Sequence, residues 1–244
     1  MMKDILCLIP AKGCSTRLPR KNLLKLGNRT LIEHAIDKAK NVRTFSTICV
    51  STEDVEIRDV SISAGAEVPF IRPEYLSNDP STIVDVVLHA INFYKHNQHK
   101  DFKYVCVLLP TSPFVEIKDI NGALTVFEQS HTKALLSVTA TEYPPFNSWS
   151  ISTSKNGDEV LSPCFPDSPY RYTKSTECPL TYRSNGAILI LEVASLIENH
   201  GYHGLPITPF VMPQERSLDI DTVYEYNLAE FMYQQRIKEK GANL

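Results

Sequence analysis

The sequence is poor in the features that mark several common classes of protein. Nine of its 244 residues are glycine, and no Gly-x-Gly-x-x-Gly fingerprint follows the first apolar run, which argues against a dinucleotide-dependent oxidoreductase. Its six cysteines include no Cys-x-x-Cys pair and no cysteine–histidine spacing of the kind that binds zinc. Scattered cysteines favour reduced thiols in a cytoplasmic protein over a disulfide framework.

Long hydrophobic runs and a domain-wide basic face are also missing. The run Ile5–Ile9 is too short for the core of a signal peptide, and no stretch approaches the length of a membrane span. With 25 basic and 28 acidic residues the net charge is −3, unlike that of a typical nucleic-acid-binding domain. The seven histidines show no metal-binding spacing, and no nucleophile elbow is present. We therefore expect a cytoplasmic protein with no membrane partner and no nucleic-acid partner.

Apolar runs alternate with helical patterns along much of the chain. Strands are expected at Ile5–Ala11, Thr47–Ser51, Val68–Ile71, Tyr104–Leu109, Ala134–Thr139, Ala187–Leu191 and Ile207–Met212. Apolar residues have helical spacing over 31–39 and 83–94, and further helices are expected at Val193–Glu198 and Val223–Ile237. This alternation predicts an α/β fold with a mostly parallel, doubly wound (Rossmann-like) sheet that helices cover on both faces.

Residues 143–182 interrupt the alternation. The stretch is rich in proline and aromatic residues, as in Tyr143-Pro-Pro-Phe-Asn147 and Ser162-Pro-Cys-Phe-Pro-Asp-Ser-Pro169. It is weakly periodic, so we expect an ordered excursion with little regular structure, within a single domain that spans residues 1–244. Its aromatic content favours burial over a bare surface insertion.

One loop concentrates positive charge. Residues 12–29 hold six Lys or Arg and no Asp or Glu. The loop follows the apolar run Ile5–Ile9, and its small residues Gly13 and Ser15 expose backbone N–H groups. Because ligands of such sheets bind beyond the carboxyl ends of the strands, we predict a cradle for the phosphate oxygens of a small anionic ligand.

Four motifs in order extend this picture over nearly the whole chain. They are Ile9-Pro-Ala-Lys-Gly-Cys-Ser-Thr-Arg-Leu-Pro-Arg-Lys-Asn22, Pro110-Thr-Ser-Pro113, Arg183-Ser-Asn-Gly-Ala-Ile188 and Ser217-Leu-Asp-Ile-Asp-Thr222. Together they resemble the motifs of the cytidylyltransferases that activate nine-carbon 2-keto sugar acids, the sialic acid (CMP-nonulosonate) synthetases. The resemblance implies transfer of CMP from CTP to the anomeric hydroxyl of such a sugar acid, with release of pyrophosphate.

The resemblance assigns the nucleotide to the first motif. The candidates for binding CTP are Lys12, Gly13, Ser15, Arg17, Lys21 and Asn22. The resemblance implies that the cation after Ala11 and Lys21 contact the triphosphate and that Ser15 and Asn22 contact the nucleotide, and Lys21 is also a catalytic candidate. Most relatives carry Arg at the position of Lys12, and Lys keeps the charge but loses the bidentate geometry of a guanidinium. The alternative for this loop is a solvated basic turn.

Asp219 and Asp221 are the candidate metal ligands. They alternate along an extended segment, so their side chains point to the same side. Carboxylate oxygens beside a phosphate site suit Mg²⁺, and the resemblance implies that this pair holds the catalytic Mg²⁺. The alternative for Asp221 is that it caps the closing helix.

The sugar acid is assigned to a second set of residues. Ser81 is expected to cap the helical pattern 83–94, and a cation with helix amides suits the carboxylate of a sugar acid. The alternative is that Arg72 is a surface arginine and that Ser81 is an ordinary helix N-cap. The full set comprises Arg72, Ser81, Thr82, Leu109, Thr111, Ser112, Arg183, Asn185 and Gly186.

Leu109 departs from the family pattern. Relatives usually carry Gln at this position, which reaches the sugar, whereas Leu neither donates nor accepts a hydrogen bond. This substitution favours a deoxy or diamino nonulosonate, of the legionaminate or pseudaminate type, over N-acetylneuraminate.

The resemblance also implies a quaternary structure. In the family, the region equivalent to residues 143–182 pairs two subunits and completes the neighbour's sugar pocket, so we expect a homodimer. The run Ser15-Thr-Arg-Leu-Pro19 also resembles the loop of Kdo cytidylyltransferase, which is an alternative activity. An alternative of another class is a catalytically silent nucleotide-binding module, against which Asp219 and Asp221 argue.

Overall fold

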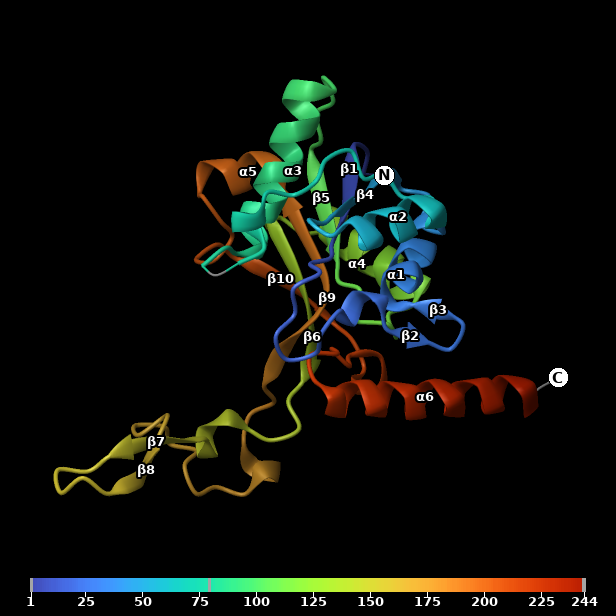
Figure 1. The fold of residues 1–244 in the computed structure, drawn as a ribbon. Coiled ribbons are helices and arrows are strands. Elements are labelled where there is room, and N and C mark those ends of the chain that lie inside the picture. The colour runs from blue at the N-terminus through green and yellow to red at the C-terminus, as the bar shows by residue number, and fades with distance from the viewer. Residues whose placement is uncertain (1, 79, 243–244) are drawn as a thin grey trace.

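A six-stranded sheet forms the centre of the computed structural model, which describes residues 2–78 and 80–242 (Figure 1). In spatial order the strands are β10 (Ile207–Val211), β6 (Ala134–Ala140), β9 (Tyr182–Glu192), β5 (Tyr104–Leu108), β1 (Ile5–Pro10) and β4 (Phe45–Ser51). β1 pairs in parallel with β4 and β5, and β10 pairs in parallel with β6. β9 runs antiparallel between β5 and β6. The prediction of a mostly parallel sheet is confirmed.

Helices cover both faces of this sheet. They are α1 (Leu31–Lys40), α2 (Val55–Ala64), α3 (Ile83–Asn97), α4 (Ile117–Gln129), α5 (Val193–Glu198) and α6 (Val223–Ala242). Successive residues of a strand point to opposite faces. Ile5 and Ile9 of β1 accordingly share one core cluster with residues of α1 and α4, whereas Leu6 and Leu8 share the other with residues of α3 and α5. The doubly wound arrangement is therefore confirmed.

Helix α6 lies beyond the end of the sheet (Figure 1). A third cluster packs its Ala229 with Leu26 of the short pair β2 (Lys25–Leu26) and β3 (Arg29–Thr30). The same cluster contains Leu18, from the loop after β1, and Ile220. It therefore holds the segment with the two candidate metal ligands against the basic loop.

The start of α3 corrects one expectation. Thr82 is the N-cap, and Thr82 and Asp85 exchange the hydrogen bonds of a capping box. The expectation that Ser81 caps this helix is therefore wrong. Ser81 Oγ donates instead to the carbonyl oxygen of Tyr75 at 2.8 Å, which ties together the segment before α3.

The expected strand Val68–Ile71 is also wrong, and proline is the reason. Glu67 N donates to the Ile48 carbonyl at 2.8 Å, and Val50 N donates to the Glu67 carbonyl at 2.9 Å, as in a parallel ladder. The next donor in such a ladder would be residue 69, which is Pro69 and has no N–H. The segment therefore makes a single bridge to β4 and continues as a loop.

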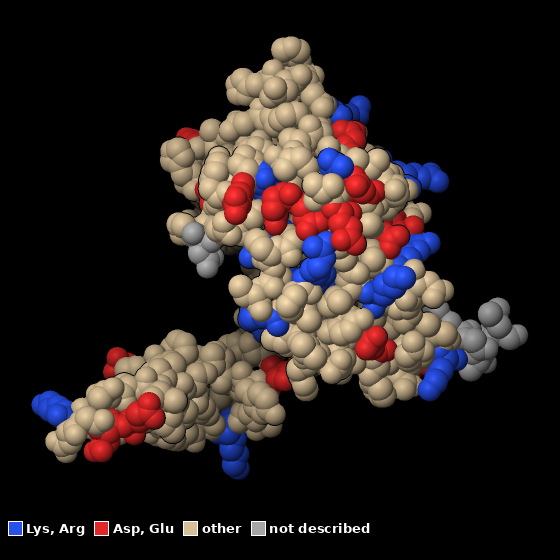
Figure 2. All heavy atoms as spheres, in the orientation of Figure 1, with Lys and Arg blue, Asp and Glu red and all other residues tan. Residues whose placement is uncertain are grey.

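Residues 143–182 form an extension away from the sheet (Figure 1). Within it β7 (Trp149–Thr153) and β8 (Glu159–Pro163) pair as an antiparallel hairpin, so the expectation of little regular structure is wrong for this part. The extension is mostly uncharged on the face that Figure 2 shows. Its large exposed apolar side chains include Tyr143, Trp149, Ile151, Leu161, Phe165, Tyr172 and Leu180.

Two further features bear on the class of protein. All six cysteines are free, and Cys7, Cys49 and Cys106 are buried within strands. Across residues 2–78 and 80–242, no helix combines the length and the apolarity that crossing a lipid bilayer requires.

Candidate functional site

The loop after β1 and the segment before α6 meet at Asp221. Lys21 Nζ donates to Asp221 Oδ1 at 2.7 Å, and Arg17 donates to Asp221 Oδ2 at 2.6 Å. The Lys21 side chain is 14% exposed, whereas the Arg17 side chain is 66% exposed. Lys21 is the first residue of a short 3-10 helix. Two predicted nucleotide-binding cations thus lie against a predicted metal ligand.

Other residues cap α6, so the capping alternative for Asp221 does not apply. Thr222 N donates to Glu225 Oε2 at 2.7 Å, and Glu225 N donates to Thr222 Oγ1 at 3.4 Å. The Asp221 carboxylate is thereby left to the cations. Partial burial acts to raise its pKa, but the hydrogen bond from Lys21 and the charges of Lys21 and Arg17 outweigh burial and lower the pKa.

Asp219 lies in a more buried setting than Asp221. Its Oδ1 is buried and has no hydrogen-bond partner within the part of the chain that the structure describes. Burial raises the pKa of Asp219, the Thr111 hydroxyl opposes this shift, and the Asp221 carboxylate adds to it. A buried, unpartnered oxygen costs free energy unless a ligand satisfies it. Asp219 therefore has the character of a binding group.

Gly186 allows β9 to approach Asp219 closely. Its φ is +68°, in the left-handed region that favours glycine. A Cβ at this position would lie 3.1 Å from Asp219 Oδ2 and 3.4 Å from Leu109 Cδ1. The fold thus brings together Gly186 and Asp219, which come from two different sequence motifs, and Leu109, which precedes a third.

A cavity opens at the carboxyl ends of β1 and β5, and we call it the central cavity. Seven predicted site residues line it: Lys12, Lys21, Asn22, Ser81, Thr82, Leu109 and Thr111. The other lining residues are Pro10, Leu76, Ser77, Asn78, Ile83, Val86 and Pro110. The Thr111 carbonyl accepts from Ile220 N at 2.8 Å, which places the cavity next to the two aspartates. A separate hollow at the amino ends of β5 and β6 contains none of the predicted residues.

The rest of the predicted nucleotide set shapes or borders the loop. Asn22 is 2% exposed, and its Nδ2 donates to the Lys12 carbonyl at 2.9 Å, which closes the loop. Lys12 itself is exposed at the cavity. Gly13 lines an adjoining hollow, and Ser15 is half-buried in the loop outside both linings.

Besides Arg72, three predicted sugar-binding side chains, those of Ser112, Arg183 and Asn185, do not line the central cavity. Asn185 is buried, where its Nδ2 donates to Ser217 Oγ at 2.9 Å and its Oδ1 accepts from Ser137 Oγ at 2.6 Å. It therefore fixes the segment that leads to the aspartates onto the sheet. Ser112 is buried among core residues, and Arg183 is exposed at the start of β9. The contact of these three residues with the sugar acid stays a prediction.

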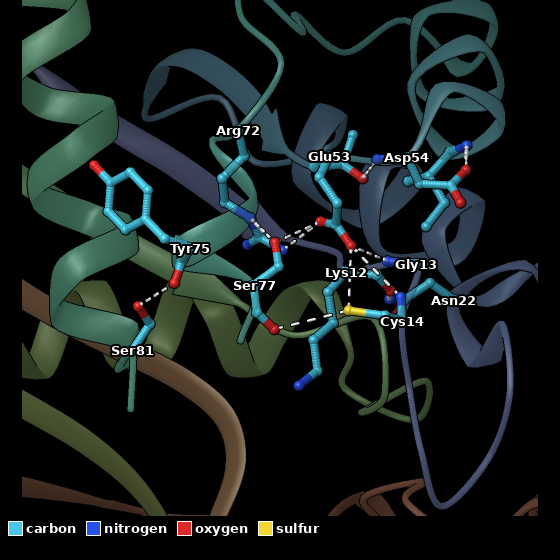
Figure 3. Close-up of polar contacts among 12 residues, drawn as sticks. Lys12, Gly13, Cys14, Asn22, Glu53, Asp54, Arg72, Tyr75, Ser77 and Ser81 are labelled. Atoms are coloured by element: carbon cyan, nitrogen blue, oxygen red, sulfur yellow. Dashed lines mark hydrogen bonds and ion pairs between the residues drawn. The ribbon is translucent and has the colours of Figure 1, made fainter. Parts of the chain in front are cut away.

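Glu53 is the residue of this region that sequence analysis missed. It lies two positions after β4, and its carboxylate accepts from Gly13 N at 2.7 Å and from Arg72 at 2.8 Å (Figure 3). Arg72 is buried and lines the adjoining hollow with Glu53, not the central cavity. A signal was present, because Glu53 lies two positions after the end of an expected strand.

The two aspartates fit a divalent cation such as Mg²⁺. Mg²⁺ commonly takes one or two protein carboxylates and completes its shell with water and phosphate oxygens. Among the described residues, no three or more His, Cys, Asp or Glu side chains converge on one metal position. The unpartnered Oδ1 of Asp219 and the adjacent cations are the arrangement that a metal bound jointly with a phosphate would need.

Comparisons with known proteins bear on this arrangement. A protein-family model described as cytidylyltransferase matches residues 6–163. Pseudaminic acid cytidylyltransferase of Campylobacter jejuni is 29% identical over 228 residues, covering 93% of this chain and 95% of that protein. CMP-N,N'-diacetyllegionaminic acid synthase of Legionella pneumophila is 33% identical over 227 residues, covering 93% and 94%. A solved structure of CMP:2-keto-3-deoxy-manno-octonic acid synthetase complexed with CTP shares the fold, with a TM-score of 0.70 at 16% identity over 96% and 100% of the two chains.

Proposed function

Because the chain belongs to the cytidylyltransferase family, we propose that it transfers CMP from CTP to the anomeric hydroxyl of a nine-carbon 2-keto sugar acid. The observation that carries this proposal is the central cavity, in which seven predicted residues from three segments meet beside Asp219 and Asp221. The names of the Campylobacter and Legionella relatives support the class of sugar.

The proposed reaction asks the protein chiefly for positioning and charge neutralisation. The sugar oxygen bonds to the α-phosphorus of CTP, the bond from that phosphorus to the bridging oxygen breaks, and pyrophosphate leaves while the hydroxyl proton is released. Lys12, Arg17 and Lys21 are the cations placed to bind the triphosphate. Since Arg17 and Lys21 pair with Asp221 in the free protein, CTP binding would exchange that carboxylate for phosphate oxygens.

We propose that Asp219 and Asp221 hold Mg²⁺ when CTP is bound. The ion would act as a Lewis acid on phosphate oxygens. The contribution of the protein is a buried oxygen of Asp219 without a partner among the described residues, and an Asp221 carboxylate that Lys21 and Arg17 keep ionised before CTP binds. Free thiols in all six cysteines fit a cytoplasmic location, which we also propose.

The direct test is product formation. The protein is incubated with CTP, Mg²⁺ and a panel of N-acetylneuraminate, legionaminate, pseudaminate and Kdo, and each reaction is followed by pyrophosphate release and by the mass of the CMP product. We expect a CMP-sugar with at least one nine-carbon acid. Absence of product with every nine-carbon acid, in a sample that still binds CTP, would overturn the proposed activity.

The lining of the central cavity favours a sugar with apolar substituents. Leu76, Ile83, Val86 and Leu109 contribute hydrocarbon to it. A polar sugar hydroxyl that is buried there without a hydrogen-bond partner costs roughly 1–3 kcal/mol. We therefore propose a deoxy, diacylamino nonulosonate of the pseudaminate or legionaminate type as the preferred substrate.

Leu109→Gln is expected to shift this preference. The amide would supply a donor and an acceptor to a sugar hydroxyl, so the ratio of kcat/KM for diamino sugars over N-acetylneuraminate should fall by about tenfold, which corresponds to about 1.4 kcal/mol. Steady-state kinetics with both sugars measure the ratio. Ile62→Gln, at a position of α2 that is 52% exposed, is the matched control. An unchanged ratio would place Leu109 away from the sugar.

We propose that the extension pairs two copies of the chain. It is mostly uncharged on the face that Figure 2 shows, and it exposes large apolar side chains that a monomer would leave in water. Examples on both strands of the hairpin are Ile151, 71% exposed, and Leu161, 64% exposed. Burial of such side chains against a second copy would release this unfavourable hydration.

Sedimentation velocity at micromolar concentration should accordingly show a dimer. Ile151→Glu places a charge on the hairpin and is expected to shift the population toward monomer, since a buried unpaired charge is costly. Ile62→Glu introduces the same charge on α2 and should leave the dimer unchanged. A parent protein that sediments as a monomer would contradict the proposed assembly.

A further inference from the structure

Glu53 binds two separate segments of the site with its two carboxylate oxygens. Oε1 accepts from Gly13 N at 2.7 Å, in the loop after β1 (Figure 3). Oε2 accepts from Arg72 at 2.8 Å and from Ser77 Oγ at 2.8 Å, and Arg72 Nε also donates to Ser77 Oγ at 3.0 Å. One side chain therefore connects the basic loop with residues 72–77, which precede α3.

Both connected segments contribute to the central cavity. Lys12, which precedes Gly13, lines it, and so does Ser77. Figure 3 shows the carboxylate of Glu53 between Gly13 and Ser77. A change in the length of this side chain would therefore alter the distance between the two walls.

Burial makes the connection firm. Arg72 is 3% exposed and Ser77 is 5% exposed, so water does not compete freely for their contacts. Burial acts to raise the pKa of Glu53, but hydrogen bonds from its own backbone and from Ser77, Gly13 and Arg72 outweigh burial and lower the pKa to about 2. Glu53 is thus charged at physiological pH, and charge-assisted hydrogen bonds are roughly twice as strong as neutral ones.

The conformation of the loop is consequently fixed by the protein itself. The Gly13 N–H binds Glu53 at 2.7 Å, and the Lys12 carbonyl binds Asn22 at 2.9 Å. The Lys12 carbonyl and the Gly13 N–H belong to one peptide group, so the two contacts together fix the orientation of the peptide that follows Lys12. A cation held in place before the anion arrives loses less conformational entropy when it binds.

We propose that Glu53 is a positioning residue for the nucleotide, which holds the loop after β1 against residues 72–77 so that Lys12 and the cavity are in place before CTP binds. The inference rests on the proposed function of this cavity as the CTP site. It also gives Arg72 the role of an anchor, since its charge is balanced by Glu53 within the protein.

Glu53→Asp is the sharpest test, because it keeps the charge and shortens the side chain by one methylene. The shorter carboxylate can pair with Arg72 and Ser77 or with Gly13 N, but not with both sides at the observed distances. Misplacement of the loop by about 1 Å is expected to raise the Kd and the KM for CTP by about 10- to 100-fold. Glu53→Gln is the second variant, and Glu56→Gln is the matched control on exposed α2, where Glu56 pairs with Arg20.

Two measurements separate this inference from the proposed activity. Hydrogen exchange of the free proteins should show a protected Gly13 amide in the parent and in Glu56→Gln, and a faster one in both Glu53 variants. Calorimetric titration with CTP should then show weaker binding, while the urea midpoint of Glu53→Asp stays near that of the parent. A Gly13 amide unprotected in the parent, or CTP affinity within twofold of the parent in a folded Glu53→Asp, would overturn the positioning role even if the enzyme is active. A parent that does not bind CTP at all would instead refute the proposed function, and this inference with it.

Discussion

Asp219→Ala is expected to lower turnover in Mg²⁺ by on the order of 10²- to 10³-fold, because it removes a hard oxygen ligand from the proposed metal position. The oxygen that is lost is the buried Oδ1 without a partner in the described residues, which is the atom best prepared to bind an ion from outside. In this variant Asp221 would be the one remaining carboxylate of the proposed pair, and its two oxygens also accept hydrogen bonds from Lys21 and Arg17.

The fold should tolerate this change. A buried carboxylate with one unpartnered oxygen is a cost to the folded state, so its removal should leave the free energy of unfolding equal or slightly higher. Urea unfolding measures this, and pyrophosphate release at several Mg²⁺ concentrations measures turnover. Asp219→Asn keeps the shape and should lose activity like the alanine variant, whereas Asp37→Ala, on the exposed face of α1, should not. Turnover near that of the parent in folded Asp219→Ala would refute the metal assignment.

Lys21→Ala is the second change with a large expected effect. Lys21 is less exposed than Arg17, the other cation at Asp221, and it lines the central cavity. Its charge is therefore poorly screened by water. Loss of a cation that neutralises the triphosphate should weaken CTP binding and slow transfer, with a combined fall in kcat/KM of on the order of 10²-fold.

Lys25→Ala provides the matched control for Lys21. Lys25 lies in the same basic stretch but is exposed on β2 and outside the central cavity. Calorimetric titration with CTP and steady-state kinetics together distinguish binding from turnover. Unchanged affinity and unchanged rate in Lys21→Ala would show that Lys21 serves only to pair with Asp221.

Local sequence was enough to predict a strand or a helix where the pattern of apolar residues indicates burial or backbone conformation. The unbroken apolar run in β1 predicts a strand buried on both sides, and the spacing in 31–39 and 83–94 predicts α1 and α3. Helix α2 escapes this reasoning because it buries only Ile57 and Ser61 among its residues. A helix with so narrow a buried face leaves too weak a periodic signal.

Neighbouring residues that offer the same chemistry were not distinguished by sequence. Ser81 and Thr82 can both cap α3, and Asp221 and Thr222 can both cap α6. The structure selects Thr82 and Thr222, each paired with an acid three residues later. That choice leaves the Asp221 carboxylate to bind cations, which is a functional consequence of a capping contact.

The sequence by itself determined the α/β class, the basic loop and the alternating aspartates, since each of these is written in residues that are close along the chain. Only the tertiary structure decided which groups meet. Lys21 and Asp221 are 200 residues apart, Glu53 and Gly13 are 40 apart, and Asn185 and Ser217 are 32 apart. The physical reason is that a side chain acquires its hydrogen-bond partners from packing across the sheet, and the same packing turned Asn185 inward and gave Arg72 its partner in Glu53.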